Sequence, residues 1–193
     1  MTHVNVSVTA GARPMRADAR RNYDRLVEAA RSVFAARGSE ASIEEIARTA
    51  DVGVGTLYRH FPRRIDLVEA VYRDDVDALV ARGDELLTES DPWQALARWL
   101  EAFVAYAAAK RTFLTELHEA FEKSPGLAVS SREKIGAATG RLLARGQEAG
   151  VVRPDIDQRE LMQLVGGMCM ARGATKEQNL GLLTFVLDGI RPR

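Results

Sequence analysis

An apolar pattern with a helical period constrains this chain most, and it recurs from residue 23 to residue 190. In the first stretch, apolar residues follow the i, i+3, i+4, i+7 spacing of one helix face: Tyr23, Leu26, Val27, Ala30, Val33 and Phe34. Similar stripes follow to the end of the chain, and no segment has the convincing alternation of a strand. The sequence therefore predicts an all-α fold of about nine helices.

Residues that begin and end helices separate these stripes. Three pairs have capping-box spacing: Ser42 with Glu45, Asp157 with Glu160, and Thr175 with Gln178. Asp18 is expected to begin the first helix and Gly38 to end it. Asp91 before a proline predicts another helix start, whereas Pro125 and Gly150 are expected to stop helices.

Composition limits the classes of protein to consider. The chain has 193 residues, of which 46% are hydrophobic, enough for a sizeable core. No apolar run is long enough to span a bilayer and residues 1–13 lack a secretory signal, so we expect a cytoplasmic protein without membrane contact. Cys169 is the only cysteine, which excludes an intrachain disulfide. No catalytic set, phosphate loop or metal site occurs at plausible spacing, so we expect neither an enzyme nor a cofactor.

Charge is unevenly distributed, although the net charge is zero. Residues 13–64 contain 11 arginines and 7 acidic residues, whereas residues 74–193 contain 15 basic and 18 acidic residues. A basic front and an acidic rear favour a polyanionic partner at the front of the chain. Two ordinary solvated surfaces remain the alternative explanation.

Residues 42–61 predict two short helices joined by a tight turn at residues 50–53, braced by the longer helix before them. This is the arrangement of a helix-turn-helix. Ala47 is small enough for a helix crossing, and Val52 is expected to plug the turn into the core. Three residues are expected to hold the second helix by its inner face: Val54, Leu57 and Phe61. Its outward positions suit phosphates or base edges: Gly55, Thr56, Tyr58, Arg59 and His60.

The stretch from Ile46 to Phe61 reads IARTADVGVGTLYRHF. It resembles the signature of the TetR/AcrR regulators, whose usual form is I-A-x-x-A-G-V-S-x-G-T-L-Y-x-H-F. The resemblance is strong over residues 18–72 and only architectural beyond them. Asp51 replaces the usual glycine of the turn, and Gly53 replaces the usual N-cap serine. Aspartate tolerates the left-handed conformation and glycine is an acceptable N-cap, so we expect the turn to survive.

The resemblance implies a bacterial transcription regulator whose second short helix enters the major groove of double-stranded DNA. It also implies that a basic residue at the start of the next helix clamps a phosphate. The expected DNA-binding residues are Ser42, Val54, Gly55, Thr56, Tyr58, Arg59, His60, Arg63 and Arg64. Less functional interpretations stay open, with His60 as a solvated surface residue and Arg59 paired with an acidic neighbour.

The predicted organisation is a mobile arm (1–15), a helix-turn-helix domain (16–64) and a ligand-binding and dimerisation domain (65–193). The last part is longer than DNA reading requires, which favours a repressor released by a small-molecule effector. The residues expected to line the effector cavity are Trp99, Phe103, Leu117, His118 and Phe121, with His118 as the polar orienting group. Plain core packing is the alternative for the aromatic residues. His118 shares a helix face only with Glu122, which is too few ligands for a metal site.

The last two helices carry two apolar stripes: Leu161, Leu164, Val165, Met168, Leu183, Val186, Leu187 and Ile190. Family resemblance implies that these helices pair across a two-fold axis as a four-helix bundle, giving a homodimer and a roughly palindromic operator. Packing or a dimer seam is favoured over a redox role for Cys169. The alternative function is a DNA-binding adaptor that is controlled by a protein partner and has no ligand pocket.

Overall fold

The computed structural model describes residues 13–171, 173 and 175–192, with side-chain surroundings from residue 17 onward. The described residues form nine α-helices and two short 3-10 helices, without a strand, so the all-α prediction is confirmed. The α-helices are α1 (Arg13–Arg37), α2 (Ile43–Thr49), α3 (Val54–His60), α4 (Arg64–Leu86), α5 (Pro92–Lys110), α6 (Leu114–Lys123), α7 (Pro125–Glu148), α8 (Gln158–Cys169) and α9 (Lys176–Gly189). The 3-10 helices are η1 (Gly38–Glu40) and η2 (Arg111–Phe113).

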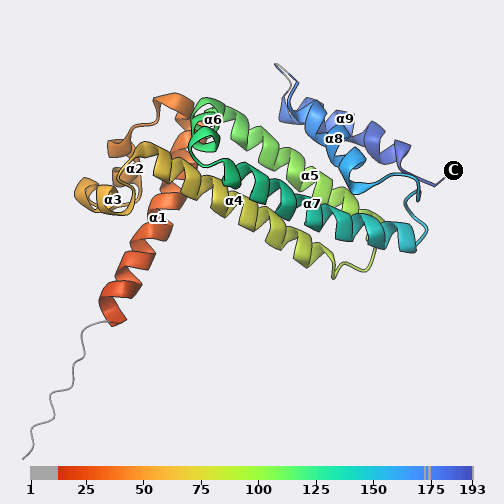
Figure 1. Cartoon of the computed structure of the whole chain (residues 1–193), viewed down its shortest axis with the longest axis horizontal. Coiled ribbons are helices and arrows are strands. Elements are labelled where there is room, and N and C mark those ends of the chain that lie inside the picture. Colours follow the sequence, from red (N-terminus) through yellow and green to blue (C-terminus); the bar gives the residue numbers. More distant parts are fainter. Residues whose placement is uncertain (1–12, 172, 174, 193) are drawn as a thin grey trace, which may run out of the picture.

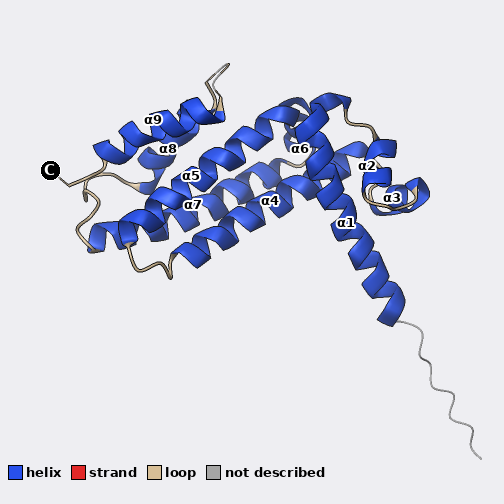
Figure 2. Cartoon of the chain, turned by 180° about the vertical axis from the view of Figure 1, so that it is seen from behind, coloured by secondary structure: helices blue, strands red, loops and turns tan. Residues whose placement is uncertain are grey.

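The helices build an elongated molecule with different ends (Figure 1). Helices α2 and α3 lie beside α1 at one end, whereas α4, α5 and α7 run lengthwise as a bundle. Helices α8 and α9 pack together on the far part of the bundle, as the view from behind also shows (Figure 2). Helix α4 contacts α1 as well as α5, α6 and α7, and so joins the α1–α3 end to the bundle. None of the described helices is long and apolar enough to cross a membrane.

Two helix boundaries differ from the sequence-based expectation. Helix α1 begins at Arg13, so Asp18 lies inside it and residues 13–15 of the predicted arm are helical; residues 1–12 lie outside the described part. Pro125 does not stop a helix but begins α7, directly after α6 ends at Lys123. Proline fits a first helical position because its missing amide N–H has no partner there.

Most of the predicted caps are formed. Complete capping boxes occur at Asp157–Glu160 and Thr175–Gln178. The Asp91 carboxylate accepts the backbone N–H of Trp93 at 2.9 Å, which fixes the start of α5. Ser42 forms half of its box: its hydroxyl accepts the Glu45 N–H at 3.1 Å, while the Glu45 carboxylate lies 3.7 Å from Arg37.

The centre of the bundle is packed around Trp99 of α5, which is fully buried. Its indole N–H donates to the Thr139 hydroxyl of α7 at 3.0 Å. Its ring lies against Gly83 of α4, where an added Cβ would come within 3.0 Å of a ring carbon. Helices α4 and α5 can therefore approach closely only because position 83 has no side chain. Trp93, at the start of the same helix, is only partly buried and lies under the Arg191 guanidinium, 3.8 Å from its ring centroid.

Candidate functional site

The turn between α2 and α3 is held by α1. Asp51 has a φ of +51°, in the left-handed region that the usual glycine would adopt without strain. The Arg25 guanidinium donates to the Asp51 backbone carbonyl at 2.9 Å and to its carboxylate at 3.0 Å. These contacts stabilise the turn in the presence of aspartate, and Val52 packs against the core beside them.

Helix α3 is anchored by one face only. Leu57 is fully buried and Phe61 nearly so, with the Phe61 ring centroid 5.1 Å from that of Tyr23 in α1. Val54 does not belong to this inner face, contrary to the sequence-based expectation, because its side chain is 37% exposed. Val54 lies on the first turn of α3, where the exposed residues 53–55 extend past the core.

The outward face of α3 exposes Gly55, Tyr58 and Arg59, with Thr56 partly covered. The Arg59 guanidinium folds back along its own helix, donating to the Gly55 carbonyl at 3.2 Å and the Thr56 hydroxyl at 2.9 Å. No described acidic residue forms an ion pair with Arg59. Its guanidinium can therefore turn toward a ligand without the loss of a salt bridge.

His60 lies at the edge of this face rather than at its centre. Its ring is partly buried, with its centroid 6.2 Å from that of Tyr23 in an edge-to-face contact. This position differs from the solvated surface histidine considered above, because part of the ring packs on α1. Ser42 is exposed at the start of α2, where its hydroxyl caps the helix.

The two arginines at the start of α4 point in different directions. Arg63 is exposed and pairs with Asp66 one turn later, whose pKa is lowered by that hydrogen bond. Arg64 turns inward: it donates to the backbone carbonyls of Ser39 (3.4 Å) and Ala41. Of the two arginines expected to clamp a phosphate, Arg63 is therefore the more accessible, and Arg64 is engaged by the protein itself.

Arg64 instead belongs to a contact between the α1–α3 end of the molecule and helix α6. Its guanidinium lies 3.2 Å from the Glu116 carboxylate of α6 and 5.1 Å from the ring centroid of Phe34 in α1. The Phe34 ring packs on Phe113 of η2, with centroids 5.5 Å apart. At Gly38, an added Cβ would lie only 2.7 Å from the Thr112 carbonyl oxygen. Arg64 thus fastens the segment before α2 to the start of α6.

The residues expected to line one effector cavity do not all face the same space. His118 is 79% exposed on α6, with its Nε2 3.8 Å from the Glu122 carboxylate, so it cannot orient a ligand in the interior. Trp99 and Leu117 are buried in the core, and Phe121 packs edge-on against Tyr72, with centroids 5.2 Å apart. Among the described residues, no group of three or more His, Cys, Asp or Glu is arranged to hold a metal ion.

Of these five residues, Phe103 lines a pocket. This pocket lies between α5, α7 and α8 and has a volume of about 430 Å³. Its walls include Phe103, Ile135 and Met162, and its rim carries Arg132 and Arg159. An apolar floor with a few polar groups is typical of a small-molecule site.

The expected dimer residues divide between two faces of α8 and α9. Four of them are buried within the protomer: Leu161, Val165, Leu183 and Ile190. Met168, Val186 and Leu187 are partly buried, and only Leu164 is fully on the exposed side. The exposed apolar side chains of this region include others that the sequence analysis missed: Met170, Leu182 and Phe185.

Cys169 of α8 is buried, and this burial raises the pKa of its thiol. The raised pKa argues for a packing role rather than redox reactivity.

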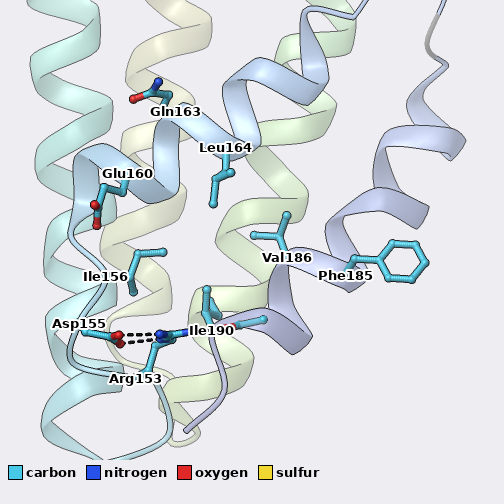
Figure 3. Close-up of a pocket in the computed structure, with 10 residues that line it drawn as sticks. Arg153, Asp155, Ile156, Glu160, Gln163, Leu164, Phe185, Val186 and Ile190 are labelled. Atoms are coloured by element: carbon cyan, nitrogen blue, oxygen red, sulfur yellow. Dashed lines mark hydrogen bonds and ion pairs between the residues drawn. The ribbon is translucent and has the colours of Figure 1, made fainter. Parts of the chain in front are cut away.

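A shallow pocket of about 660 Å³ marks the exposed side of α8 and α9 (Figure 3). Phe185 stands out from α9, away from the other side chains that line this pocket, and is 73% exposed. Leu164 faces the same region from α8, and an Arg153–Asp155 ion pair closes one end. We name Leu164, Leu182 and Phe185 the outer apolar face.

The fold and the anchored α2–α3 pair define a helix-turn-helix protein with a helical body. Residues 26–71 match the tetR family of bacterial regulatory proteins, and residues 91–192 match the C-terminal domain of SbtR-like transcriptional regulators. The chain is thus a member of the tetR family.

Individual proteins agree with this assignment. A TetR transcriptional regulator from Streptomyces coelicolor is 37% identical, with a TM-score of 0.77 over 88% of this chain and 98% of that chain. A TetR regulatory protein from Mycobacterium vanbaalenii is 34% identical, with a TM-score of 0.73 over 93% of this chain and 100% of the Mycobacterium chain. An HTH-type transcriptional regulator from Staphylococcus aureus is 40% identical over 67 residues, 34% of this chain. That match spans about a third (36%) of the Staphylococcus protein.

Proposed function

We propose that this chain is a dimeric, DNA-binding repressor that a small molecule releases from its operator. The observation that carries the proposal is the two-sided character of α3. Leu57 fixes one side to the core, while Tyr58 and Arg59 stand exposed on the other. A helix that is rigidly mounted yet exposes hydrogen-bonding side chains suits insertion into a major groove.

Within this proposal, the contacts to DNA divide into two kinds. Arg59 supplies a forked donor that suits a guanine edge. Thr56, Tyr58 and His60 supply hydroxyl and imidazole groups that suit phosphates, as does the exposed guanidinium of Arg63. Ser42, Val54 and Gly55 are exposed as well and complete the proposed contact surface.

Dimerisation through α8 and α9 is the second part of the proposal. Packing within the protomer does not explain the outer apolar face, because its side chains remain exposed in the protomer. Two copies related by a two-fold axis would cover this face as a four-helix bundle. The two copies of α3 would then read a roughly palindromic site.

For the effector, the pocket beside Phe103 replaces the originally predicted cavity. It has a suitable size and an apolar floor, and it lies between α5, α7 and α8. Helix α5 contacts α4, and α4 contacts α1, so a ligand that shifts α5 has a mechanical route to the DNA-binding end. A coupling of about 1–3 kcal/mol would change operator affinity about 5- to 150-fold.

The test begins with sequencing of the DNA fragments that the purified chain retains from its source genome. Fluorescence anisotropy then measures affinity for a retained fragment and for a scrambled control between low and high salt. We expect a shared, roughly palindromic sequence and an affinity that falls steeply with salt, because phosphate contacts release counterions. No common sequence, or an affinity indifferent to salt, would refute the proposal.

A further inference from the structure

A third pocket, of about 400 Å³, lies where α1, α4, α5 and η2 meet. It shares no lining residue with the pocket beside Phe103. Its walls are alanines, Leu79 and the rings of Tyr106 and Phe113. Its charged side chains come from α1 and α4: Arg31, Asp74, Asp75 and Arg82.

Ion pairs at this junction leave an excess of negative charge. Arg31 of α1 pairs with Glu28 of its own helix and with Asp74 and Asp75 of α4, with a distance of 2.6 Å between its Nε and the Asp75 carboxylate. Asp75 also pairs with Lys110. Three carboxylates thus share two cations, while Arg82, the other charged lining residue, is already neutralised by Glu85 at 2.9 Å.

The two rings that line the pocket already contact a cation. Lys110 is nearly buried, and its ammonium nitrogen lies 5.0 Å from the Tyr106 ring centroid and 5.3 Å from that of Phe113. Aromatic faces attract cations at such distances through their quadrupole. Burial lowers the pKa of Lys110, and Asp75 opposes this by stabilising the charged form. Asp75 and the two ring faces therefore favour positive charge at this junction, whereas burial opposes it.

We propose that this junction pocket binds a small organic cation, an ammonium or amidinium group attached to an apolar frame. Its charge pairs with Asp74, which is 58% exposed and is the most accessible carboxylate of the lining. Its frame lies against Tyr106 and Phe113. A pocket of this volume suits a ligand of one or two rings.

Such a ligand would compete with part of the α1–α4 contact. Arg31 is the α1 side chain that reaches Asp74, so a ligand cation there displaces one of its ion pairs. Because Tyr23 of α1 packs on Phe61 beside α3, a loosened α1 would also alter the position of α3. This regulatory consequence rests on the proposed function, whereas binding itself does not.

The experiment titrates the full chain with three small aromatic probes and follows them by NMR. The probes are benzyltrimethylammonium, neutral N,N-dimethylbenzamide and anionic 3-phenylpropionate. We expect the cation to bind at least about fivefold more tightly than either control, the size that an ion pair with a partly exposed carboxylate supports.

A matched pair of variants locates the site. Asp74→Asn should weaken binding of the cation about three- to tenfold. Asp84→Asn should leave it unchanged, although Asp84 is on the same helix, is similarly exposed (55%) and also pairs with an arginine, Arg141. Ala78→Phe, at an exposed lining position, should fill the pocket and remove binding. Circular dichroism checks that each variant is folded.

Equal binding of the three probes, or equal loss in Asp74→Asn and Asp84→Asn, would overturn the proposal. So would undiminished binding by folded Ala78→Phe. Addition of the cation to the DNA complex then tests the regulatory consequence: weaker DNA binding in the wild type but not in Ala78→Phe supports it, and no change rejects it. If the chain binds no DNA, the proposed function fails, while the NMR titration still decides on the pocket.

Discussion

Helices α2 and α3 at one end and α8 and α9 at the other both expose side chains, but they do so differently. In α3, apolar residues occupy one face, and the exposed remainder is polar apart from Val54 and Gly55. In α9, apolar residues occur around most of the helix: Leu183 is buried, Leu187 is partly covered and Phe185 is exposed. A helix that is apolar on opposite sides can pack on both. The exposed side of α9 therefore suits an apolar partner, whereas the exposed side of α3 suits a polar ligand.

The largest effect should come from a charge on the outer apolar face. Phe185→Glu should weaken dimerisation more than about 100-fold, because the two-fold axis buries the carboxylate twice in an apolar interface. Sedimentation velocity measures the change. The control is Val129→Glu, which places a charge on an exposed apolar residue of α7. A Phe185→Glu dimer as stable as the Val129→Glu dimer would place the interface elsewhere.

Substitutions of the two arginines at the start of α4 should distinguish an effect on stability from an effect on DNA affinity. Arg64→Ala should lower the free energy of unfolding by about 1–3 kcal/mol, because the mostly buried Glu116 carboxylate loses its partner. Denaturant titration measures this. Arg63→Ala should leave stability nearly unchanged and reduce the salt slope of DNA binding by about 1. The opposite pattern would restore Arg64 as the phosphate clamp.

A base-specific effect is expected for Arg59. Arg59→Ala should cost about 1–3 kcal/mol on the operator and relax preference at one base position, because a bidentate contact to guanine is lost. Anisotropy on operators with single base changes measures this, and Arg63→Ala serves as the phosphate-contact comparison. An equal loss on every sequence would assign Arg59 to the backbone instead.

The smallest effect concerns the start of α2. Ser42→Ala should destabilise the protein by about 1 kcal/mol, since the Glu45 N–H loses its acceptor. Thermal unfolding measures this, and Ser42→Asp, which retains an acceptor, should restore the lost stability. If Ser42→Asp is no better than Ser42→Ala, the hydroxyl contributes in some other way.

The all-α fold and most helix starts could be predicted from the sequence, because caps such as Asp91 and Asp157 act within one turn of their own residue. The inner face of α3 was predictable at Leu57 and Phe61 for a similar reason: the short turn at residues 50–53 leaves α3 little freedom to rotate about its own axis. The face of α9 was not predictable, because apolar periodicity does not distinguish protomer core from an interface.

The candidate effector residues show a different limit. His118 directly follows buried Leu117, so helical geometry turns it about 100° away from the core. Its chemistry suggested a ligand contact, but its position in the period already indicated exposure. Arg63 and Arg64 are alike in chemistry, and only the packing of Arg64 on Phe34 and Glu116, far apart in sequence, distinguishes them.

The contrast between Trp99 and Trp93 gives the protein two distinct optical reporters. Trp99 is sealed between Gly83 and Thr139, so its emission should be blue-shifted and insensitive to iodide. Trp93 is partly exposed beneath Arg191, a residue just past the end of α9. Its emission should therefore shift when the C-terminal helices associate with or separate from a second copy of the chain. In Trp99→Phe, the remaining tryptophan fluorescence comes from Trp93 and should report on dimer assembly. In Trp93→Phe, it comes from Trp99 and should report on the interior of the bundle.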